Sequence, residues 1–227
     1  MNKIIIGIIG AGRIGKLHIS NIIKHIPQFH IKAIADPYVD DSWANSQSIP
    51  HLFKDANEIF IDPEITAVLI CSPSTSHANH IISAAQAGKH IFCEKPISTN
   101  IKQIQEALHA VKISNVKLQV GFNRRFDPNF AKIKKMLSND NIGTPQLLRI
   151  TSRDPKIPSI EYLKESGGMF IDTTIHDFDM ARFLMNSEIE EIYANANALI
   201  HPSVSECDDI DTAIINLKFV NNFVGKK

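Results

Sequence analysis

A lysine at the end of a predicted strand is the strongest candidate for chemistry in this sequence. Lys95 lies between Glu94 and Pro96, directly after the apolar run His90 to Cys93. Where parallel strands form an open sheet, ligands bind in the crevice outside the carboxyl ends of the strands. A lysine at that place can hydrogen-bond a substrate oxygen and stabilise negative charge that develops on it. We therefore expect Lys95 to be a catalytic residue.

A carboxylate and a histidine form a second candidate. Asp172 and His176 follow the pair Gly167-Gly168 and lie four residues apart, a spacing that places both side chains on one face of a helix. The carboxylate can then fix the tautomer of the imidazole and raise its basicity, which suits proton abstraction. A capping aspartate followed by a core histidine would give the same pattern. Asp177 and Asp179 lie on other faces, so no metal site is expected.

A glycine-rich turn precedes the first predicted helix. Gly10, Gly12 and Gly15 follow the apolar run Ile4 to Ile9 with the spacing G-x-G-x-x-G. In dinucleotide-binding folds the first glycine allows a tight turn, the second lets the pyrophosphate approach the backbone, and the third permits close packing of helix and strand. The pyrophosphate then meets the N-terminus of the helix. The expected cofactor contacts in this turn are Gly10, Gly12, Arg13, Ile14 and Gly15.

An acidic residue ends the second predicted strand, Ile31 to Ala35. Asp36 follows the glycines by about 20 residues, the separation at which a carboxylate accepts hydrogen bonds from the ribose of NAD. The next five residues contain no lysine or arginine to offset the 2′-phosphate of NADP. We therefore expect NAD to be the cofactor, although an aspartate before Pro37 can also simply begin a turn.

Two further loops supply expected cofactor contacts. Ser72 and Pro73 follow the predicted strand Ala67 to Cys71, where hydroxyl and backbone groups can line the ribose of the nicotinamide half. His77 comes in the first turn of the next helix and can contact the cofactor, pack locally or cap that helix. Glu94, which lies beside Lys95, is also an expected cofactor contact.

The composition excludes several classes of function. Lysine and arginine number 24, aspartate and glutamate also number 24, and no basic stripe runs along the chain, so nucleic acid is not an expected partner. No apolar run reaches the roughly 18 residues of a membrane span, and Ile4 to Ile9 has the character of a buried strand, not of a signal peptide. The three cysteines lack the spacing of a disulfide framework. We expect a cytoplasmic protein with no membrane partner.

Apolar runs of strand length alternate with helical segments in the first half of the chain. The expected strands are Ile4 to Ile9, Ile31 to Ala35, Ala67 to Cys71, His90 to Cys93 and Lys117 to Gly121, and the expected helices are Arg13 to Ile26, Ser76 to Ala87 and Ile101 to Ile113. This alternation predicts an α/β fold, a doubly wound parallel sheet of Rossmann type, over residues 1–121.

From residue 122 onward the pattern changes. The expected helices are Asn129 to Leu137 and Gly168 to Met185, and the expected strands are Leu147 to Thr151, Ile189 to Ala198 and Asp211 to Val220. Strands gathered beside few helices indicate an α+β domain with a mainly antiparallel sheet, over residues 122–227. The sequence contains no internal repeat.

Together these motifs resemble the glucose-fructose oxidoreductase and inositol dehydrogenase family (Gfo/Idh/MocA). The resemblance rests on Gly10 to Gly15, Glu94-Lys95-Pro96, Gly121 to Pro128 and Gly167 to Asp179, and it covers essentially the whole chain. It implies NAD-dependent oxidation of a cyclic polyol gripped between the two domains, namely myo-inositol to the 2-keto-inositol scyllo-inosose. It also implies a homo-oligomer formed through the sheet of the second domain.

The resemblance assigns roles to individual residues. Lys95, Asp172 and His176 would be the catalytic residues that also bind substrate, with His176 as the base. Arg125 and Asp154 would hydrogen-bond ring hydroxyls. Taken as residues alone, Arg125 could instead form a salt bridge in the domain linker, and Asp154, which precedes Pro155, could equally be a turn residue.

The end of the chain differs from that family, whose members continue further. We expect the strand Asp211 to Val220 to run into a hairpin turn at Asn221-Asn222 with no return strand after it. The second sheet would then be incomplete and would expose an unpaired edge. Two alternatives to inositol oxidation stay open on this ground: a related sugar dehydrogenase, and a non-catalytic NAD-binding remnant or sensor.

Overall fold

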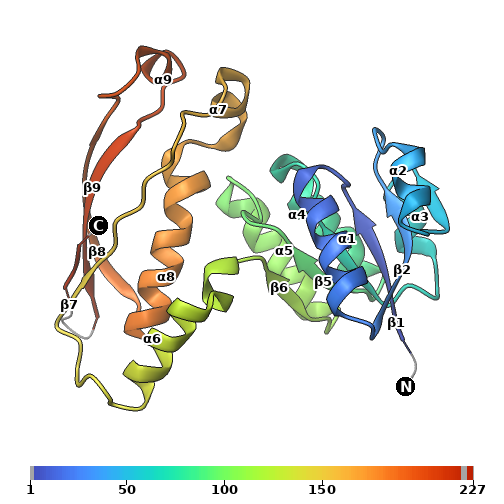
Figure 1. The fold of residues 1–227 in the computed structure, drawn as a ribbon, viewed down its shortest axis with the longest axis horizontal. Helices are drawn as coiled ribbons and strands as arrows, with labels where there is room; N and C mark the ends of the chain where they lie inside the picture. Colours follow the sequence, from blue (N-terminus) through green and yellow to red (C-terminus); the bar gives the residue numbers. More distant parts are fainter. Residues whose placement is uncertain (1–2, 221–223, 227) are drawn as a thin grey trace. The chain divides into compact units, whose positions relative to one another are not determined.

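The computed structural model describes residues 3–220 and 224–226. The chain divides into two compact units, residues 1–121 and 122–227. Each unit has its own sheet and its own hydrophobic core (Figure 1). Within the described ranges, no helix combines the length and the apolar character that crossing a bilayer requires.

The first unit is built on a six-stranded sheet in the order β3-β2-β1-β4-β5-β6. All of its strand pairs are parallel, and the order reverses between β1 and β4, so the predicted doubly wound fold is confirmed. The strands are β1 (Ile4–Ile9), β2 (Phe29–Ala35), β3 (His51–Phe53), β4 (Ala67–Ile70), β5 (His90–Cys93) and β6 (Leu118–Val120). The helices are α1 (Arg13–His25), α2 (Asp41–Ser46), α3 (Asn57–Ile61), α4 (Ser74–Gln86) and α5 (Ile101–Ile113).

Both faces of this sheet are covered, because successive side chains of a strand point to opposite faces. Ile8 of β1 belongs to a buried cluster with Ile19 and Ile22 of α1. The next residue, Ile9, belongs to a second cluster that includes Ile81 of α4. The short elements α2, β3 and α3 were not predicted, because three to six residues cannot display a clear apolar period.

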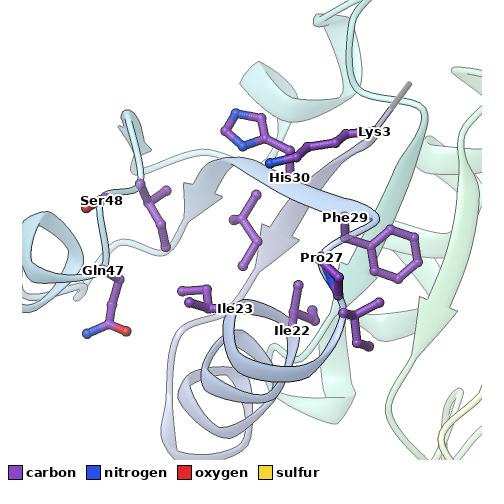
Figure 2. A pocket seen from close by; sticks show the side chains of 11 residues that line it. Lys3, Ile22, Ile23, Pro27, Phe29, His30, Gln47 and Ser48 are labelled. Carbon is purple, nitrogen blue, oxygen red and sulfur yellow. The ribbon is translucent and has the colours of Figure 1, made fainter. Parts of the chain in front are cut away.

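A hollow of about 280 Å³ lies at the end of this sheet where strands β1 and β2 begin (Figure 2). Lys3 precedes β1, Phe29 and His30 begin β2, and the segment after α2 contributes Gln47 and Ser48. Among the described residues that line it, none is an expected cofactor contact. Ligands of doubly wound sheets bind at the other end of the strands, outside their carboxyl ends.

The second unit contains a four-stranded sheet in the order β7-β10-β9-β8. Strands β8 and β10 pair antiparallel with β9, and β10 pairs parallel with β7, so the sheet is mainly antiparallel as predicted. The strands are β7 (Leu147–Arg149), β8 (Ile189–Asn197), β9 (Thr212–Phe219) and β10 (Val224–Lys226). The helical elements are η1 (Asn123–Phe126), α6 (Pro128–Ser138), α7 (Ile160–Ser166), η2 (Phe170–Thr174), α8 (Ile175–Met185) and α9 (Pro202–Glu206).

Helix α8 covers one face of this sheet (Figure 1). Ala181 and Met185 of α8 form a buried cluster with Ile215, Leu217 and Phe219 of β9. The three β9 residues alternate along the strand, and this period of two is what identified β9 in the sequence. The cluster fixes α8, which carries His176 in its first turn and directly follows η2 with Asp172.

The expectation that no strand returns after β9 is wrong. Val224–Lys226 forms β10 and pairs antiparallel with Asn216 to Lys218 of β9. Strand β9 therefore has a neighbour on each side and is not an unpaired edge. A strand of three residues is too short to show an alternating pattern, so the sequence could not reveal it. The predicted turn at Asn221-Asn222 lies outside the described residues.

Candidate functional site

The turn between β1 and α1 has the close packing of a dinucleotide site. Gly10 has a φ of +92°, and a Cβ there would lie 2.5 Å from the backbone nitrogen of Ser72. A Cβ on Gly15 would overlap the carbonyl oxygen of Gly10. A Cβ on Gly12 would meet nothing within 4 Å, and no side chain caps the first turn of α1, where Arg13 and Ile14 lie. These residues therefore fit the pyrophosphate of a dinucleotide.

Asp36 joins the end of β2 to the glycine turn. One carboxylate oxygen accepts a hydrogen bond of 2.6 Å from the backbone N–H of Ala11. The other accepts a hydrogen bond of 2.7 Å from the N–H of Tyr38, which is the turn that the sequence also allowed. Each carboxylate oxygen has a second lone pair, so the group can still accept from a ribose hydroxyl.

Replacing Asp36 by asparagine is expected to reduce the preference for NAD over NADP by about tenfold, or about 1.4 kcal/mol. The amide keeps the shape of the side chain but removes the negative charge that repels a 2′-phosphate. Calorimetric dissociation constants for both dinucleotides measure the ratio, with the exposed Asp41 of α2 replaced by asparagine as the matched control. An unchanged ratio in the Asp36 variant would reject the role in cofactor choice.

His77 lies inside the first unit and has only 2% of its surface exposed. Its Nδ1 lies 2.7 Å from the carbonyl oxygen of Pro96, and its Nε2 lies 2.8 Å from the carbonyl oxygen of Ser72. Both ring nitrogens thus face the protein's own backbone, as the packing role left open by the sequence requires. The Ser72 hydroxyl pairs with that of Ser76 at 2.8 Å, and exposed Pro73 leads directly into α4.

Glu94 and Lys95 follow β5 at the carboxyl end of the sheet, and both are partly buried. One carboxylate oxygen of Glu94 lies 2.7 Å from Nε2 of His18 in α1, within hydrogen-bond distance. A Cβ on Gly121, after β6, would lie 3.0 Å from the other Glu94 oxygen. The Glu94 carboxylate therefore connects α1 to the segment that carries Lys95. The role of His18 could not be predicted from the sequence, because 76 residues separate the two partners.

Two cysteines lie near this segment, Cys93 buried and Cys71 partly buried. Burial, and then the charge of Glu94, raises the pKa of the Cys71 thiol to about 12. Burial is also the main cause that raises the pKa of Cys93. Both thiols are therefore protonated near neutral pH, and neither has the reactivity of a catalytic thiolate.

In the second unit, Asp172 and His176 lie on a helix that contains one wide turn. The segment Phe170–Thr174 is π-helical, and α8 continues from it. Single π-helical turns inside α-helices occur often at functional sites. The hydroxyl of Tyr162 in α7 donates a hydrogen bond of 2.8 Å to Asp172. The ring of His176 is partly buried and meets that of Phe122 edge-on, with centroids 6.4 Å apart.

The start of this helix is anchored by a residue that the sequence did not reveal. Asp209, in the loop before β9, accepts a hydrogen bond of 3.0 Å from the backbone N–H of Met169. Gly168 has a φ of +83°, and a Cβ there would lie 3.0 Å from the same carboxylate. The double glycine therefore lets Asp209 cap the helix closely.

A cavity of about 660 Å³ lies within the second unit next to this helix. It brings together the predicted residues Asp154 and Asp172, and Tyr162 lines it as well. Neither His176 nor Arg125 is among its described lining residues. A volume of this size is within the range of about 300 to 1,000 Å³ that small-molecule sites occupy.

Arg125 forms the salt bridge that the sequence left as its alternative role. Its Nε and Nη2 donate hydrogen bonds of 2.8 and 2.5 Å to Asp179 of α8, whose side chain is 5% exposed. The neighbouring Arg124 donates a hydrogen bond of 2.6 Å to Asp177. The two arginines thus hold η1 against α8, and Asp179 raises the pKa of Arg125 above its ordinary value.

Arg125→Ala is expected to lower the free energy of unfolding by about 2 to 3 kcal/mol, because it leaves a buried carboxylate without its charged partner. Arg182→Ala is the matched control, since Arg182 pairs with Glu188 through exposed side chains, and an exposed pair contributes about 1 kcal/mol or less. Urea denaturation measures both variants. If both variants lose the same free energy of unfolding, the Arg125–Asp179 pair contributes no more than an exposed ion pair, and the prediction is wrong.

Among the described residues, no group of three or more histidine, cysteine, aspartate or glutamate side chains could hold a metal ion. Asp177 and Asp179 instead face the two arginines of η1. The carboxylates that the sequence presented near His176 are therefore engaged in ion pairs.

Two family models match the chain. Residues 4–122 match the Gfo/Idh/MocA oxidoreductase family, described as an NAD-binding Rossmann fold. Residues 130–226 match the Gfo/Idh/MocA C-terminal domain. The two matches fall on the two compact units.

Curated relatives and solved structures agree with these models. The chain is 55% identical over 96% of its length to the uncharacterized oxidoreductase YrbE of Bacillus subtilis, and 42% identical over 97% of its length to myo-inositol 2-dehydrogenase of Thermotoga maritima. It spans 64% and 66% of those relatives. A scyllo-inositol dehydrogenase structure from Lactobacillus casei, with bound NAD(H) and scyllo-inositol, superposes with a TM-score of 0.90 at 31% identity and covers 99% of this chain and 68% of that one.

Proposed function

Because the chain belongs to the Gfo/Idh/MocA oxidoreductase family, we propose that it oxidises a cyclic polyol, in the first place myo-inositol to scyllo-inosose, with NAD as the hydride acceptor. The observation that carries this proposal is the cavity of the second unit, which Asp154 and Asp172 line together. Two carboxylates in one cavity can accept hydrogen bonds from several ring hydroxyls. Relatives named myo-inositol 2-dehydrogenase and scyllo-inositol dehydrogenase support this choice of substrate.

The first unit is proposed to hold NAD through its glycine turn and Asp36. Gly10 and Gly15 make the turn compact, and the open face at Gly12 leaves room for the pyrophosphate. Asp36 would accept hydrogen bonds from the adenosine ribose while it braces Ala11. When bound, NAD supplies the ring carbon that receives the hydride.

Proton transfer is assigned to the second unit and charge stabilisation to the first. An alcohol becomes a ketone when its carbon loses hydride and its oxygen loses a proton, so a base must take that proton. We assign this step to a ring nitrogen of His176, with Asp172 orienting the imidazole. Lys95 would donate a hydrogen bond to the same oxygen and stabilise the alkoxide charge as it develops.

Asp154 and Arg125 receive different support as substrate contacts. Asp154 lines the cavity beside Asp172 and is proposed to bind ring hydroxyls. Arg125 has two of its five N–H donors engaged by Asp179, so a polyol would have to be contacted by the N–H groups of Nη1 or by the second N–H of Nη2. We therefore propose Asp154 as the stronger determinant of substrate binding.

A related sugar-acid dehydrogenase is the second candidate. Arg153 and Lys156 also line the cavity, and a cation there would pair with a substrate carboxylate. Neutral inositols would gain nothing from such a pair. Comparison of inositol isomers, hexoses and hexuronic acids as substrates separates the two candidates.

The test of the proposed function is the formation of NADH, followed by its absorbance, with purified folded protein, NAD and each polyol in turn. Turnover with an inositol supports the proposal, and a preference for hexuronic acids favours the second candidate. Calorimetric NAD binding without turnover across the panel would reject the enzymatic proposal and leave an NAD-binding protein.

A homo-oligomer formed through the second sheet is proposed as well. Tyr193 of β8 and Ile214 of β9 lie on the face of the sheet opposite to α8, and they are 68% and 54% exposed. Exposed apolar side chains gathered on one face are typical of an interface. Sedimentation equilibrium tests this, and a monomer at micromolar concentration would reject it.

A further inference from the structure

Lys95 has an immediate neighbour on each side that is held by a histidine from a different helix. Glu94 pairs with His18 of α1 at 2.7 Å, and the carbonyl oxygen of Pro96 lies 2.7 Å from Nδ1 of His77 in α4. We propose that these two histidines, the histidine clamp, are positioning residues that hold Lys95 for catalysis. The proposal rests on the proposed oxidation of a polyol.

His18 is fixed between two residues of the strand and loop that lead to Lys95. Its ring meets that of Phe92 in β5 edge-on, with centroids 5.3 Å apart, while Nε2 contacts Glu94. The His18 and Glu94 side chains are 26% and 21% exposed, so solvent screens this pair only in part. Gly121 closes the other side, because a Cβ there would lie 3.0 Å from the Glu94 carboxylate. Glu94 therefore has little room to move.

His77 ties the Lys95 segment to the neighbouring loop of the sheet. Its rigid ring lies between the carbonyl oxygen of Pro96, after β5, and the carbonyl oxygen of Ser72, after β4. The ring is buried, so water does not compete for either contact. A displacement of the segment that carries Lys95 would therefore change the contact between Nδ1 of His77 and the carbonyl oxygen of Pro96.

This arrangement matters because the segment after β5 is a loop, and loops are the more mobile parts of a fold. A donor to a developing alkoxide acts only when it is already in place, and a misplacement of 1 Å can cost about 10²-fold in rate. Neither histidine is assigned to proton transfer. A change in either one should therefore alter kcat through Lys95 and leave the binding of NAD largely intact.

The experiment compares His18→Gln and His77→Gln with His25→Gln, a matched control in which an exposed histidine at the end of α1 is replaced. We expect kcat to fall about 10 to 100-fold in the two clamp variants and to stay unchanged in the control. The KM for NAD should change less than threefold in all of them. A loss of kcat that is matched by loss of folded protein, measured by circular dichroism, would overturn the positioning role.

A second measurement observes Lys95 directly and does not depend on turnover. Lysines are reductively methylated with ¹³C-formaldehyde, and the NMR signal of Lys95 is assigned by its disappearance in Lys95→Arg. The signal should shift in His18→Gln and His77→Gln and stay in place in His25→Gln. An unmoved signal in both clamp variants would reject the clamp even if the wild-type protein oxidises inositol. Conversely, a shifted signal in a protein without any polyol turnover would keep the clamp and reject the proposed function.

Discussion

Lys95→Ala is expected to lower kcat for inositol oxidation by about 10² to 10³-fold, the effect of removing one donor to a developing oxyanion. The lysine follows β5 at the carboxyl end of a parallel sheet, which is the edge where a doubly wound fold binds its ligands. Alanine removes the ammonium group and leaves the backbone between Glu94 and Pro96 unchanged. The initial rate of NADH formation at saturating NAD and inositol measures the loss.

The control for this prediction is Lys102→Ala, which removes an exposed lysine from the first turn of α5. It should retain full activity, and both variants should bind NAD with unchanged affinity in calorimetry. Lys95→Arg separates charge from placement, because a guanidinium keeps the positive charge but presents a longer, planar group. A kcat that stays within threefold of wild type in Lys95→Ala would contradict a role in stabilising the alkoxide.

The parts of the fold that the sequence predicted well carry strong local signals. Strands β1 and β5 and helix α5 have the predicted bounds, because each combines an apolar pattern with clear end signals. In α5 the side chain of Asn100, the residue before the helix, accepts hydrogen bonds from the backbone N–H groups of Lys102 and Gln103. Such caps depend on neighbours in the sequence and can be recognised from it.

The candidate site was predictable where it depends on motif spacing and not where it depends on distant contacts. The glycine turn and Asp36 lie together, since the N–H of Ala11 reaches the Asp36 carboxylate. The contacts of Asp172 with Tyr162 and of Met169 with Asp209 join segments whose partners no periodicity identifies. The π-helical turn at Asp172 is also invisible to a pattern of apolar residues, because it changes the backbone and not the composition.

The role of Arg125 also depends on a contact between distant segments, which the sequence does not reveal. Its sequence context allowed both a substrate contact and a salt bridge, and only the fold brings Asp179 within hydrogen-bond distance of two guanidinium nitrogens. The sequence placed Asp177 and Asp179 away from the face of His176 but did not show what they contact. Their arginine partners lie more than 50 residues earlier in the chain, so the pairing emerges from tertiary structure alone.

His176→Asn is expected to lower kcat by about 10² to 10⁴-fold, the contribution of a positioned general base. Asparagine can still donate and accept hydrogen bonds but cannot take up the proton that leaves the alcohol. Steady-state kinetics with inositol measure kcat, and the pH profile of kcat/KM adds a second reading, because a general base gives it a rising limb. That limb should be lost in the variant.

The competing explanation is that His176 is a packing residue of the second unit, since its ring is partly buried and meets Phe122 edge-on. A packing role predicts a lower unfolding midpoint and a loss of activity only in proportion to unfolded protein. A catalytic role predicts loss of kcat in a protein that stays folded and binds NAD through the first unit. His201→Asn is the matched control, because this exposed histidine caps α9 and asparagine is a preferred N-cap residue.

Tyr162→Phe distinguishes the two explanations further, because it removes the hydrogen bond to Asp172 without changing the shape of the ring. If Asp172 orients His176 for proton transfer, loss of this one hydrogen bond should lower kcat by about tenfold or less, since a single such bond contributes about 1 kcal/mol. The effect in the double variant with His176→Asn should then be smaller than the product of the two single effects, because both act on one step. Independent effects that multiply would place Tyr162 and His176 in separate roles and would contradict the proposed Asp172–His176 pair.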